Sequence, residues 1–252
     1  MTVQRRPLGH EIVRLEEAPS TNTLLLENEA WLDNHGLVLL ARHQTSGRGR
    51  MGRVWSSRPG LQLQFTIAVH PRLPGAEIPA TALIAGLSVA QAIEAVTGLQ
   101  PELHWPNDVY LSGRKVCGIL VEARPNAAGA ARLAVGIGIN CLGAASDYPA
   151  EVRERLTTLA EAAGRPVDPE AVLRAVLERL DRHLARLDAG GREDLLAEWQ
   201  HQARVEGALV RFPGSSGRIQ GAVLGLTPEG FLRVRDAAGG EHTLVSGDVE
   251  WL

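Results

Sequence analysis

Residues 47 to 55 read Gly-Arg-Gly-Arg-Met-Gly-Arg-Val-Trp, and this stretch constrains the protein more than any other part of the chain. Glycine permits positive φ and lets the backbone approach a ligand closely. Arginine carries a permanent planar cation that grips carboxylate or phosphate through two parallel hydrogen bonds. Between Asn34 and Ala76 the chain has six arginines and no Asp or Glu, so we expect no neighbouring carboxylate to neutralise the loop. The stretch predicts a flexible cationic loop that closes over a small anion.

The size and composition of the chain bound its class. With 252 residues and 44% hydrophobic content it can form one large domain plus a small appended one. A net charge of −3 argues against broad affinity for nucleic acids or anionic membranes. We identify no apolar run long enough to span a bilayer, and Met1 to Gly9 is too polar for a signal peptide. Two cysteines without metal-ligand spacing, Cys117 and Cys141, favour a cytoplasmic protein with reduced thiols.

Hydrophobic periodicity predicts a mixed set of strands and helices, followed by a region of short β segments. The first part, residues 1–204, is expected to be one catalytic domain, and residues 205–252 a small barrel of about five strands. Strands are expected at residues 10–17, 37–41, 61–69, 102–111, 115–123 and 132–140, and helices at 20–33, 78–96 and, with breaks at 164–166 and 190–191, at 151–204.

The loop also satisfies the pattern G-x-G-x-x-G, so a dinucleotide-binding fold is one alternative. That fingerprint must open a helix and be followed about 20 residues later by an acidic residue. Here the loop leads to Pro59-Gly60 and a strand, and the next acidic residue is Glu77. A loop that binds RNA or DNA is a second alternative, because arginine and glycine also occur together in such segments. The shortness of the loop and the acidic net charge favour a small ligand over both.

Lysine is almost absent from the chain. Of the 26 basic residues, 25 are arginine and one is Lys115. A single lysine suggests a position where a compact ammonium fits and a guanidinium fork does not, although chance would leave the same trace.

Five separated segments carry a resemblance to a known family. They are Ser20-Thr21-Asn22, Gln44 to Trp55, Trp105-Pro106-Asn107-Asp108, Lys115 to Glu122, and Gly136 to Asn140. Over nearly its whole length the chain resembles the biotin protein ligases. The resemblance implies an α+β fold with a mixed β-sheet and flanking helices, related to class II aminoacyl-tRNA synthetases, plus a small C-terminal SH3-like β-barrel.

The resemblance also implies a reaction in two steps. Biotin and MgATP give biotinyl-5′-AMP and pyrophosphate, and the biotinyl group then passes to one lysine of a biotin carboxyl carrier domain of acetyl-CoA carboxylase. The first step joins two anions, so their repulsion must be cancelled. Arg48, Arg50 and Arg53 can supply the positive field, and closure of the loop excludes the water that would hydrolyse the adenylate.

Site residues follow from matching the family motifs to this sequence. Arg50 and Lys115 are expected to be catalytic, and Mg²⁺ to accompany ATP with Asp108 as one candidate ligand. Biotin is expected to contact Ser20, Thr21, Asn22, Gln44, Gly47, Arg48, Gly49, Arg50, Lys115 and Gly118. ATP or AMP is expected to contact Arg50, Arg53, Trp55, Asn107, Asp108 and Asn140.

Several of these residues have plainer interpretations. Ser20 can be merely a helix cap, Asn107 and Asp108 a turn, and Trp55 an ordinary core tryptophan. Cys117 lies in an apolar strand and is expected to be a buried hydrophobe rather than a nucleophile.

The chain departs from the family pattern at His104, where members often carry lysine, and this puts a phosphate contact at that position in doubt. Because only about twenty residues precede Ser20, we expect a monofunctional ligase without specific DNA binding. The oligomeric state stays open, a homodimer included. A lipoate–protein ligase and a non-catalytic regulator that binds biotin or a nucleotide are the rival functions.

Overall fold

The computed structural model describes residues 6–71, 78–127, 129–214, 217–247 and 249–252. The expectation about Met1 to Gly9 therefore lies partly outside the described residues, as does the 72–77 part of the stretch that lacks carboxylates.

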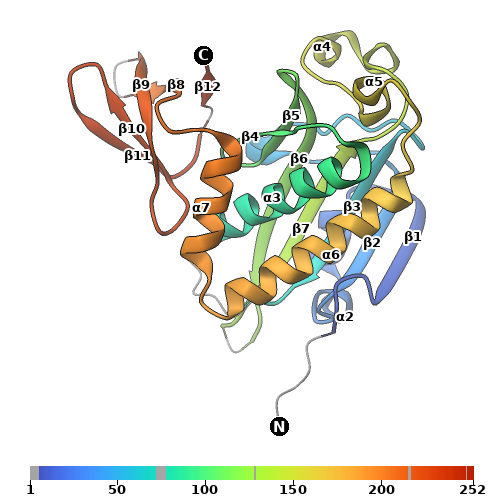
Figure 1. Ribbon diagram of the computed structural model, residues 1–252. Coiled ribbons are helices and arrows are strands. Elements are labelled where there is room, and N and C mark those ends of the chain that lie inside the picture. The colour runs from blue at the N-terminus through green and yellow to red at the C-terminus, as the bar shows by residue number, and fades with distance from the viewer. Residues whose placement is uncertain (1–5, 72–77, 128, 215–216, 248) are drawn as a thin grey trace.

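A seven-stranded mixed sheet forms the centre of the molecule, in the order β1-β2-β3-β7-β6-β5-β4 (Figure 1). The first two strands are parallel, and all the other neighbours are antiparallel. The strands are β1 (Glu11–Ala18), β2 (Leu37–Gln44), β3 (Gln62–Val69), β4 (Glu102–His104), β5 (Asp108–Leu111), β6 (Arg114–Pro125) and β7 (Ala131–Asn140). The mixed sheet with flanking helices confirms the predicted fold class.

Helices cover the two faces of this sheet unequally. The long helices α3 (Ile78–Thr97) and α6 (Pro169–Asp188) lie side by side across one face, with α7 (Arg192–Ala203) beside them (Figure 1). Among the described residues, the helices on the other side of the strands are the short α1 (Thr21–Glu27) and α2 (Glu29–Leu32). Two further short helices, α4 (Ala150–Arg153) and α5 (Leu159–Ala163), precede α6. The face near α1 and α2 is thus left partly open.

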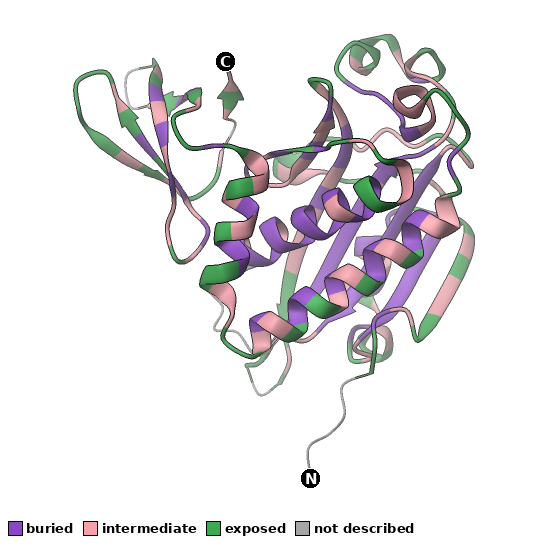
Figure 2. Ribbon diagram, viewed as in Figure 1, coloured by how far each residue is buried: buried purple, intermediate pink, exposed green. Residues whose placement is uncertain are grey.

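Alternation along β3 separates the two faces of the sheet. Leu63, Phe65 and Ile67 belong to the large apolar core beneath α3 and α6, and the intervening Gln64 and Thr66 are equally buried but polar. Successive side chains of a strand point to opposite faces, so one strand builds an apolar core on one side and a polar surface on the other. Figure 2 shows the result: the central strands and most of α3 are buried, the edge strand β1 is largely exposed, and α6 is buried only along its inner stripe.

Helix α3 corrects one expectation from the sequence. Its segment Pro79–Thr97 is 19 residues long with a mean hydropathy of 1.5, so by length and composition it could cross a membrane. However, 67% of that segment is buried inside the protein, where it packs against α6 and the sheet. An apolar helix buried on most sides is the expected form of a core helix.

Two predicted elements are interrupted in the structure. The helix expected over residues 20–33 breaks at Asn28, whose Oδ1 accepts a hydrogen bond from Trp31 N at 3.1 Å and so caps α2. The strand expected over residues 102–111 breaks at Trp105–Asn107, because Pro106 has no N–H to donate to the ladder. The turn between β4 and β5 therefore projects polar groups at the edge of the sheet.

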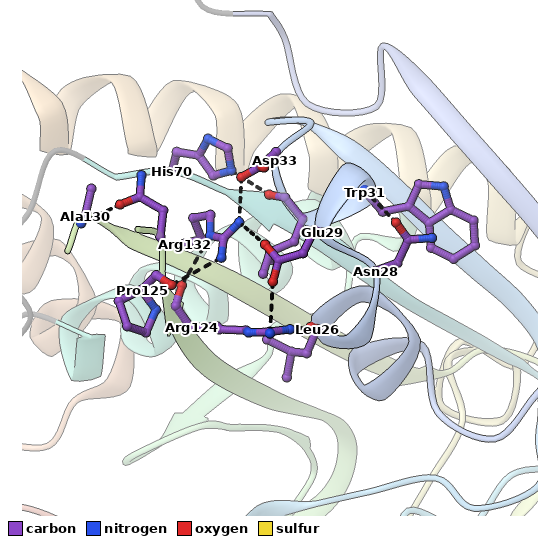
Figure 3. A network of polar contacts seen from close by, with 12 residues as sticks. Leu26, Asn28, Glu29, Trp31, Asp33, His70, Arg124, Pro125, Ala130 and Arg132 are labelled. Atoms are coloured by element: carbon purple, nitrogen blue, oxygen red, sulfur yellow. Dashed lines mark hydrogen bonds and ion pairs between the residues drawn. The ribbon is translucent and has the colours of Figure 1, made fainter. Parts of the chain in front are cut away.

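A buried arginine holds α2 against the far ends of β6 and β7 (Figure 3). The Arg132 side chain is 6% exposed and donates to Glu29 Oε2 and Asp33 Oδ1, both at 2.6 Å. Arg124 pairs with the other oxygen of Glu29 at 2.9 Å. Because a buried cation needs such partners, this network fixes α2, and with it the direction of α1.

The C-terminal region, predicted to be a small barrel of about five strands, forms a five-stranded antiparallel sheet in the order β11-β10-β9-β8-β12, which is consistent with an SH3-like fold. Its strands are β8 (Leu209–Gly214), β9 (Gly217–Leu226), β10 (Leu232–Asp236), β11 (Glu241–Leu244) and β12 (Glu250–Trp251). It contacts the first region directly: Trp105 Nε1 donates to Gly230 O at 3.0 Å, and Gln200 Oε1 accepts from Leu226 N at 2.8 Å. The division at residues 204 and 205 stays a prediction.

Candidate active site

A cavity of about 240 Å³ lies on the open face of the sheet. Its walls come from the start of α1, the arginine-rich loop, the turn between β4 and β5, and strands β6 and β7. Thirteen of the predicted site residues line it: Ser20, Thr21, Asn22, Gln44, Arg48, Gly49, Arg50, Arg53, Trp55, Asn107, Asp108, Lys115 and Gly118.

The arginine-rich loop folds back on itself as a short hairpin. Arg48 and Val54 form an isolated antiparallel bridge, and Gly49 N donates to Arg53 O at 2.7 Å. The tip turns through Met51 and Gly52, with φ of 55° and 74°. Positive φ is costly for most residues and free for glycine, so Gly52 suits the tip, whereas Met51 adopts the left-handed region without being glycine. The fold of the loop directs Arg48, Arg50 and Arg53 to the cavity.

Arg48 is paired with a carboxylate that is distant in the sequence, although none lies near the loop in the chain. Arg48 Nη2 lies 2.6 Å from Glu122 Oε1, and its Nη1 donates to Thr23 Oγ1 at 3.1 Å. The carboxylate comes from β6, 74 residues along the chain, so no local count of charges could reveal it. Arg50 Nη1 donates to Asn107 Oδ1 at 3.1 Å, which ties the loop to the turn between β4 and β5.

The closed end of the cavity is a chain of neutral hydrogen-bonding groups. Thr21 donates through both its backbone N and its Oγ1 to Gln44 Oε1, at 2.7 and 3.1 Å. Gln44 Nε2 in turn donates to Gln64 Oε1 at 3.0 Å. Ser20 is the N-cap of α1, although its bond from Thr23 N is long at 3.5 Å, and it also faces the cavity. Such an array suits a polar ligand without charge at this end.

Asn22 has its amide orientation fixed by three hydrogen bonds. Its Nδ2 donates to Leu120 O at 3.1 Å and to Glu122 Oε2 at 3.0 Å, and its Oδ1 accepts from Thr66 Oγ1 at 2.6 Å. Both N–H donors of Asn22 are therefore in use, and only its carbonyl oxygen has a lone pair to offer a ligand. The backbone of Gly136 lies so close that a Cβ there would overlap Asn22.

Glycines on β6 and β7 make room for an aromatic ring. Gly118 and Gly138 face each other across these strands, and a Cβ on Gly138 would lie 2.6 Å from two ring carbons of Trp55. The Trp55 indole packs flat on this glycine floor inside the cavity, rather than in the core. Its Nε1 is buried and has no hydrogen-bond partner among the described residues. It is therefore a buried unsatisfied donor.

Lys115 stands at the edge of the cavity beside Asp108. Its Nζ lies 2.6 Å from Asp108 Oδ1, with both side chains largely covered, at 30% and 22% exposed. Its backbone is held on both sides, donating from N to Arg155 O at 2.8 Å and accepting at O from Thr157 N at 3.0 Å. The backbone of Lys115 is therefore held in place, and its ammonium lies at the cavity, paired with Asp108.

Comparison with known proteins gives the family. Residues 15–140 match the model of the biotin/lipoate A/B protein ligase family. The chain belongs to this family. It is 31% identical to the biotin–acetyl-CoA-carboxylase ligase of Paracoccus denitrificans over 228 residues, which cover 89% of this chain and 94% of that one. It is also 31% identical to the bifunctional ligase/repressor BirA of Bacillus spizizenii, covering 85% of this chain but 66% of that protein, just under two thirds of its length.

A solved structure shows the same fold. The biotin protein ligase from Aquifex aeolicus in complex with biotin and ATP superposes with a TM-score of 0.82 at 31% identity. The match covers 96% of this chain and 99% of that one, so the small C-terminal sheet lies within the shared fold.

Two predicted site residues of this family member do not line the cavity. Gly47 lies behind Trp55, where a Cβ would come within 2.6 Å of Trp55 O. Asn140 is buried at 3% exposed, accepting from Gln62 Nε2 at 2.9 Å and donating to Thr157 O at 3.2 Å. Through Thr157, which bonds the backbone of Lys115, Asn140 supports the lysine from behind.

Sequence reasoning missed other residues of the cavity. Gly136 and Gly138 belong to the family-matching segment Gly136 to Asn140, but neither of them was assigned a role from the sequence. Two glycines spaced by two in a strand indicate that another group packs closely against one face of that strand. Tyr110 lines the wall, and burial raises its pKa to about 12. Gly247 and Val249 come from the C-terminal region, and no local pattern marked them.

His104, the departure from the family pattern, does not line the cavity. Its ring stacks on Tyr110 with centroids 4.0 Å apart and lies 5.3 Å from that of Trp251. Burial lowers its pKa, against the opposing pull of Glu102 and Asp108. Its ring therefore lies between the cavity wall and the C-terminal strand.

Proposed function

We propose that this chain is an ATP-dependent biotin protein ligase. It activates biotin as biotinyl-5′-AMP and transfers the biotinyl group to one lysine of a biotin carboxyl carrier protein, as in acetyl-CoA carboxylase. One observation carries the proposal: a single cavity joins a neutral polar end to a cluster of cations formed by three loop arginines and Lys115. The relatives support it by name, since one is a biotin–acetyl-CoA-carboxylase ligase and another was solved with biotin and ATP.

Biotin has an uncharged ureido ring at one end and a carboxylate at the other, and the cavity is polarised in the same sense. The neutral end offers the free lone pair of Asn22 to a ureido N–H, and Gln44 and Ser20 stand beside it. A site built to hydrogen-bond such groups rejects analogues that lack them. The carboxylate then points toward Lys115 and the loop.

In the first step a biotin carboxylate oxygen attacks the α-phosphorus of ATP, and the bond to the pyrophosphate oxygen breaks. Arg50, Arg53 and Lys115 offset the repulsion between the two anions and the charge that gathers on the phosphorus oxygens. In the second step the carrier amine attacks the biotinyl carbonyl, loses a proton and expels AMP. The loop holds the mixed anhydride away from water between the two steps.

Nucleotide contacts belong to the same proposal. Trp55 presents a flat ring and an unpartnered N–H inside the cavity, which suit a nucleobase or a ring of biotin. Mg²⁺ would enter with ATP and neutralise part of the triphosphate charge. No cluster of three or more metal-ligating side chains occurs among the described residues, and one carboxylate, Asp108, is what an ion held mainly by phosphate oxygens and water requires.

A cytoplasmic location and the absence of specific DNA binding are further parts of the proposal. Both cysteines are free and buried, as expected of a reducing compartment, and the net charge of −3 disfavours DNA. A gel-shift assay on a biotin-operon fragment tests the second point, since salt-sensitive, sequence-specific retention contradicts it. The oligomeric state is not part of the proposal.

Mass spectrometry of a carrier domain tests the main proposal. After incubation with enzyme, biotin and MgATP, the carrier should gain one biotinyl group on one lysine, with release of pyrophosphate. Lipoate in parallel separates the rival activity, because turnover with lipoate alone would make the chain a lipoate ligase. Binding of biotin without release of pyrophosphate would make it a non-catalytic regulator.

A further inference from the structure

Glu122 lies at the meeting point of two parts of the site that are far apart in sequence. It stands on the face of β6 that carries Gly118 and Leu120, while Cys117 and Ile119 point into the apolar core. Its side chain is 23% exposed, which is well covered for a carboxylate. A charged residue in an otherwise apolar strand segment calls for a partner, and Glu122 has two.

The two oxygens of Glu122 serve different elements. Oε2 accepts from Asn22 Nδ2 at 3.0 Å, in the neutral end of the cavity, and Oε1 accepts from Arg48 Nη2 at 2.6 Å, at the base of the loop. Asn22 is 4% exposed, so without Glu122 one of its N–H groups would be buried without an acceptor, which is costly. Arg48 would lose the ion pair that holds it toward the sheet.

We propose that Glu122 is a positioning residue that couples the biotin-binding end of the cavity to closure of the arginine-rich loop. The inference rests on the proposed function. A ligand that engages the Asn22 carbonyl holds the Asn22 amide in place, and the amide holds Glu122, which in turn holds Arg48 and the loop. Occupancy of the neutral end therefore slows opening of the loop and lengthens retention of the adenylate.

A purely electrostatic role of Glu122 and a positioning role predict different effects of the same substitution, so an experiment can separate them. Glu122→Gln removes one negative charge beside the cavity, so a purely electrostatic role predicts tighter binding of ATP and an unchanged loop. In the positioning role, each oxygen of Glu122 accepts from a different donor. Glutamine replaces one of these oxygens by an NH2 group, which would face Asn22 or Arg48 as a second donor, so one of the two contacts is lost. The KM for biotin should then rise about tenfold with the KM for ATP within about twofold.

The first experiment is limited trypsin digestion without any substrate, with cleavage after Arg50 and Arg53 followed by mass spectrometry. Glu122→Gln should speed this cleavage about fivefold or more, while Tm stays close to that of the wild type. The matched control is Glu198→Gln, because Glu198 also accepts two hydrogen bonds from an arginine, Arg186, but on α7 outside the cavity. The control should leave both loop cleavage and the two KM values unchanged.

A second variant keeps the test decisive if Glu122→Gln does not fold. Arg48→Gln cuts the same link from the loop side and leaves the buried bond between Asn22 and Glu122 intact. It should also speed cleavage after Arg50 and Arg53, and the double variant should be no faster than the faster single one, as expected of residues that act through one contact.

Unchanged loop cleavage in both variants, or an effect confined to the KM for ATP, would overturn the inference. Because digestion needs no substrate, its outcome stands apart from the proposed function. If the wild-type protein forms no biotinyl-5′-AMP, the function fails, and the digestion still decides whether Glu122 holds the loop.

Discussion

The two faces of the central sheet use the same strands for opposite purposes. On the face beneath α3 and α6, Phe65 and Ile67 of β3 are buried in an apolar core. On the other face Gln64 and Thr66 are just as buried but form part of a hydrogen-bonded network around the cavity. Burial alone therefore does not separate structural from functional residues here; the kind of neighbour does. Substitutions on the first face should change stability, and those on the second should change substrate use.

The largest expected effect contrasts adjacent residues of β3. Ile67→Ala removes three core carbons and should lower the free energy of unfolding by about 2–5 kcal/mol, with KM for biotin unchanged while the protein is folded. Thr66→Val keeps the volume but removes the hydroxyl that bonds Asn22 Oδ1, so it should cost about 1–3 kcal/mol of stability and also raise the KM for biotin. Urea denaturation with steady-state kinetics measures both, and equal KM values in the two variants would contradict the division of the faces.

Lys115→Arg tests the cation on the cavity side. The guanidinium keeps the charge but needs more room than the ammonium that now lies 2.6 Å from Asp108. We expect adenylate formation to fall about 100-fold, the scale of losing one well-placed electrostatic group, with Tm nearly unchanged. Pyrophosphate release measures it. The control is the reverse substitution at the adjacent residue, Arg114→Lys, which should keep near wild-type activity because Arg114 pairs with Glu161 outside the cavity. Wild-type activity of Lys115→Arg would contradict the prediction and show that the reaction does not require a lysine at this position.

Two glycine-to-alanine substitutions sharpen the comparison, because one adds a methyl group on the cavity face of the sheet and the other adds one on the core face. A Cβ on Gly138 would come within 2.6 Å of Trp55, so Gly138→Ala should displace the indole and lower kcat/KM about tenfold. A Cβ on Gly86 of α3 meets Ile119 and Leu103 at an ordinary 3.6 Å. Gly86→Ala should therefore raise stability by about 0.5–1 kcal/mol, since glycine is a poor helix former, and leave kcat/KM alone. Equal kinetics for the two variants would mean that Trp55 is not part of the working site.

The sequence indicates which residues form the site better than it indicates which of them contact one another. The arginine-rich loop, the neutral segment at Ser20 and the turn at Asn107 are local patterns, and each lies at the cavity. The Arg48–Glu122 pair joins residues 74 apart, and such pairing depends on which strands become neighbours in the sheet. The break of the first helix at Asn28 was in principle readable, because asparagine is a strong N-cap. The contribution of Gly247 was not, because it depends on how the C-terminal sheet packs.

The smallest expected effect is a dependence of stability on pH that arises on the core side. Burial lowers the pKa of His183, whose Nδ1 lies 2.8 Å from Ser88 Oγ between α6 and α3. A histidine whose folded pKa is below its ordinary value near 6.5 stays neutral in the fold while the unfolded chain takes up protons. Its stabilising contribution is therefore present above about pH 6.5 and is lost as the pH falls through that value toward the folded pKa. The Tm should therefore decrease when the pH is lowered from 7.5 to 5.5. His183→Gln should flatten part of this fall, as measured by thermal denaturation at several pH values; a slope that this variant leaves unchanged would locate the titration elsewhere, away from the α3–α6 face.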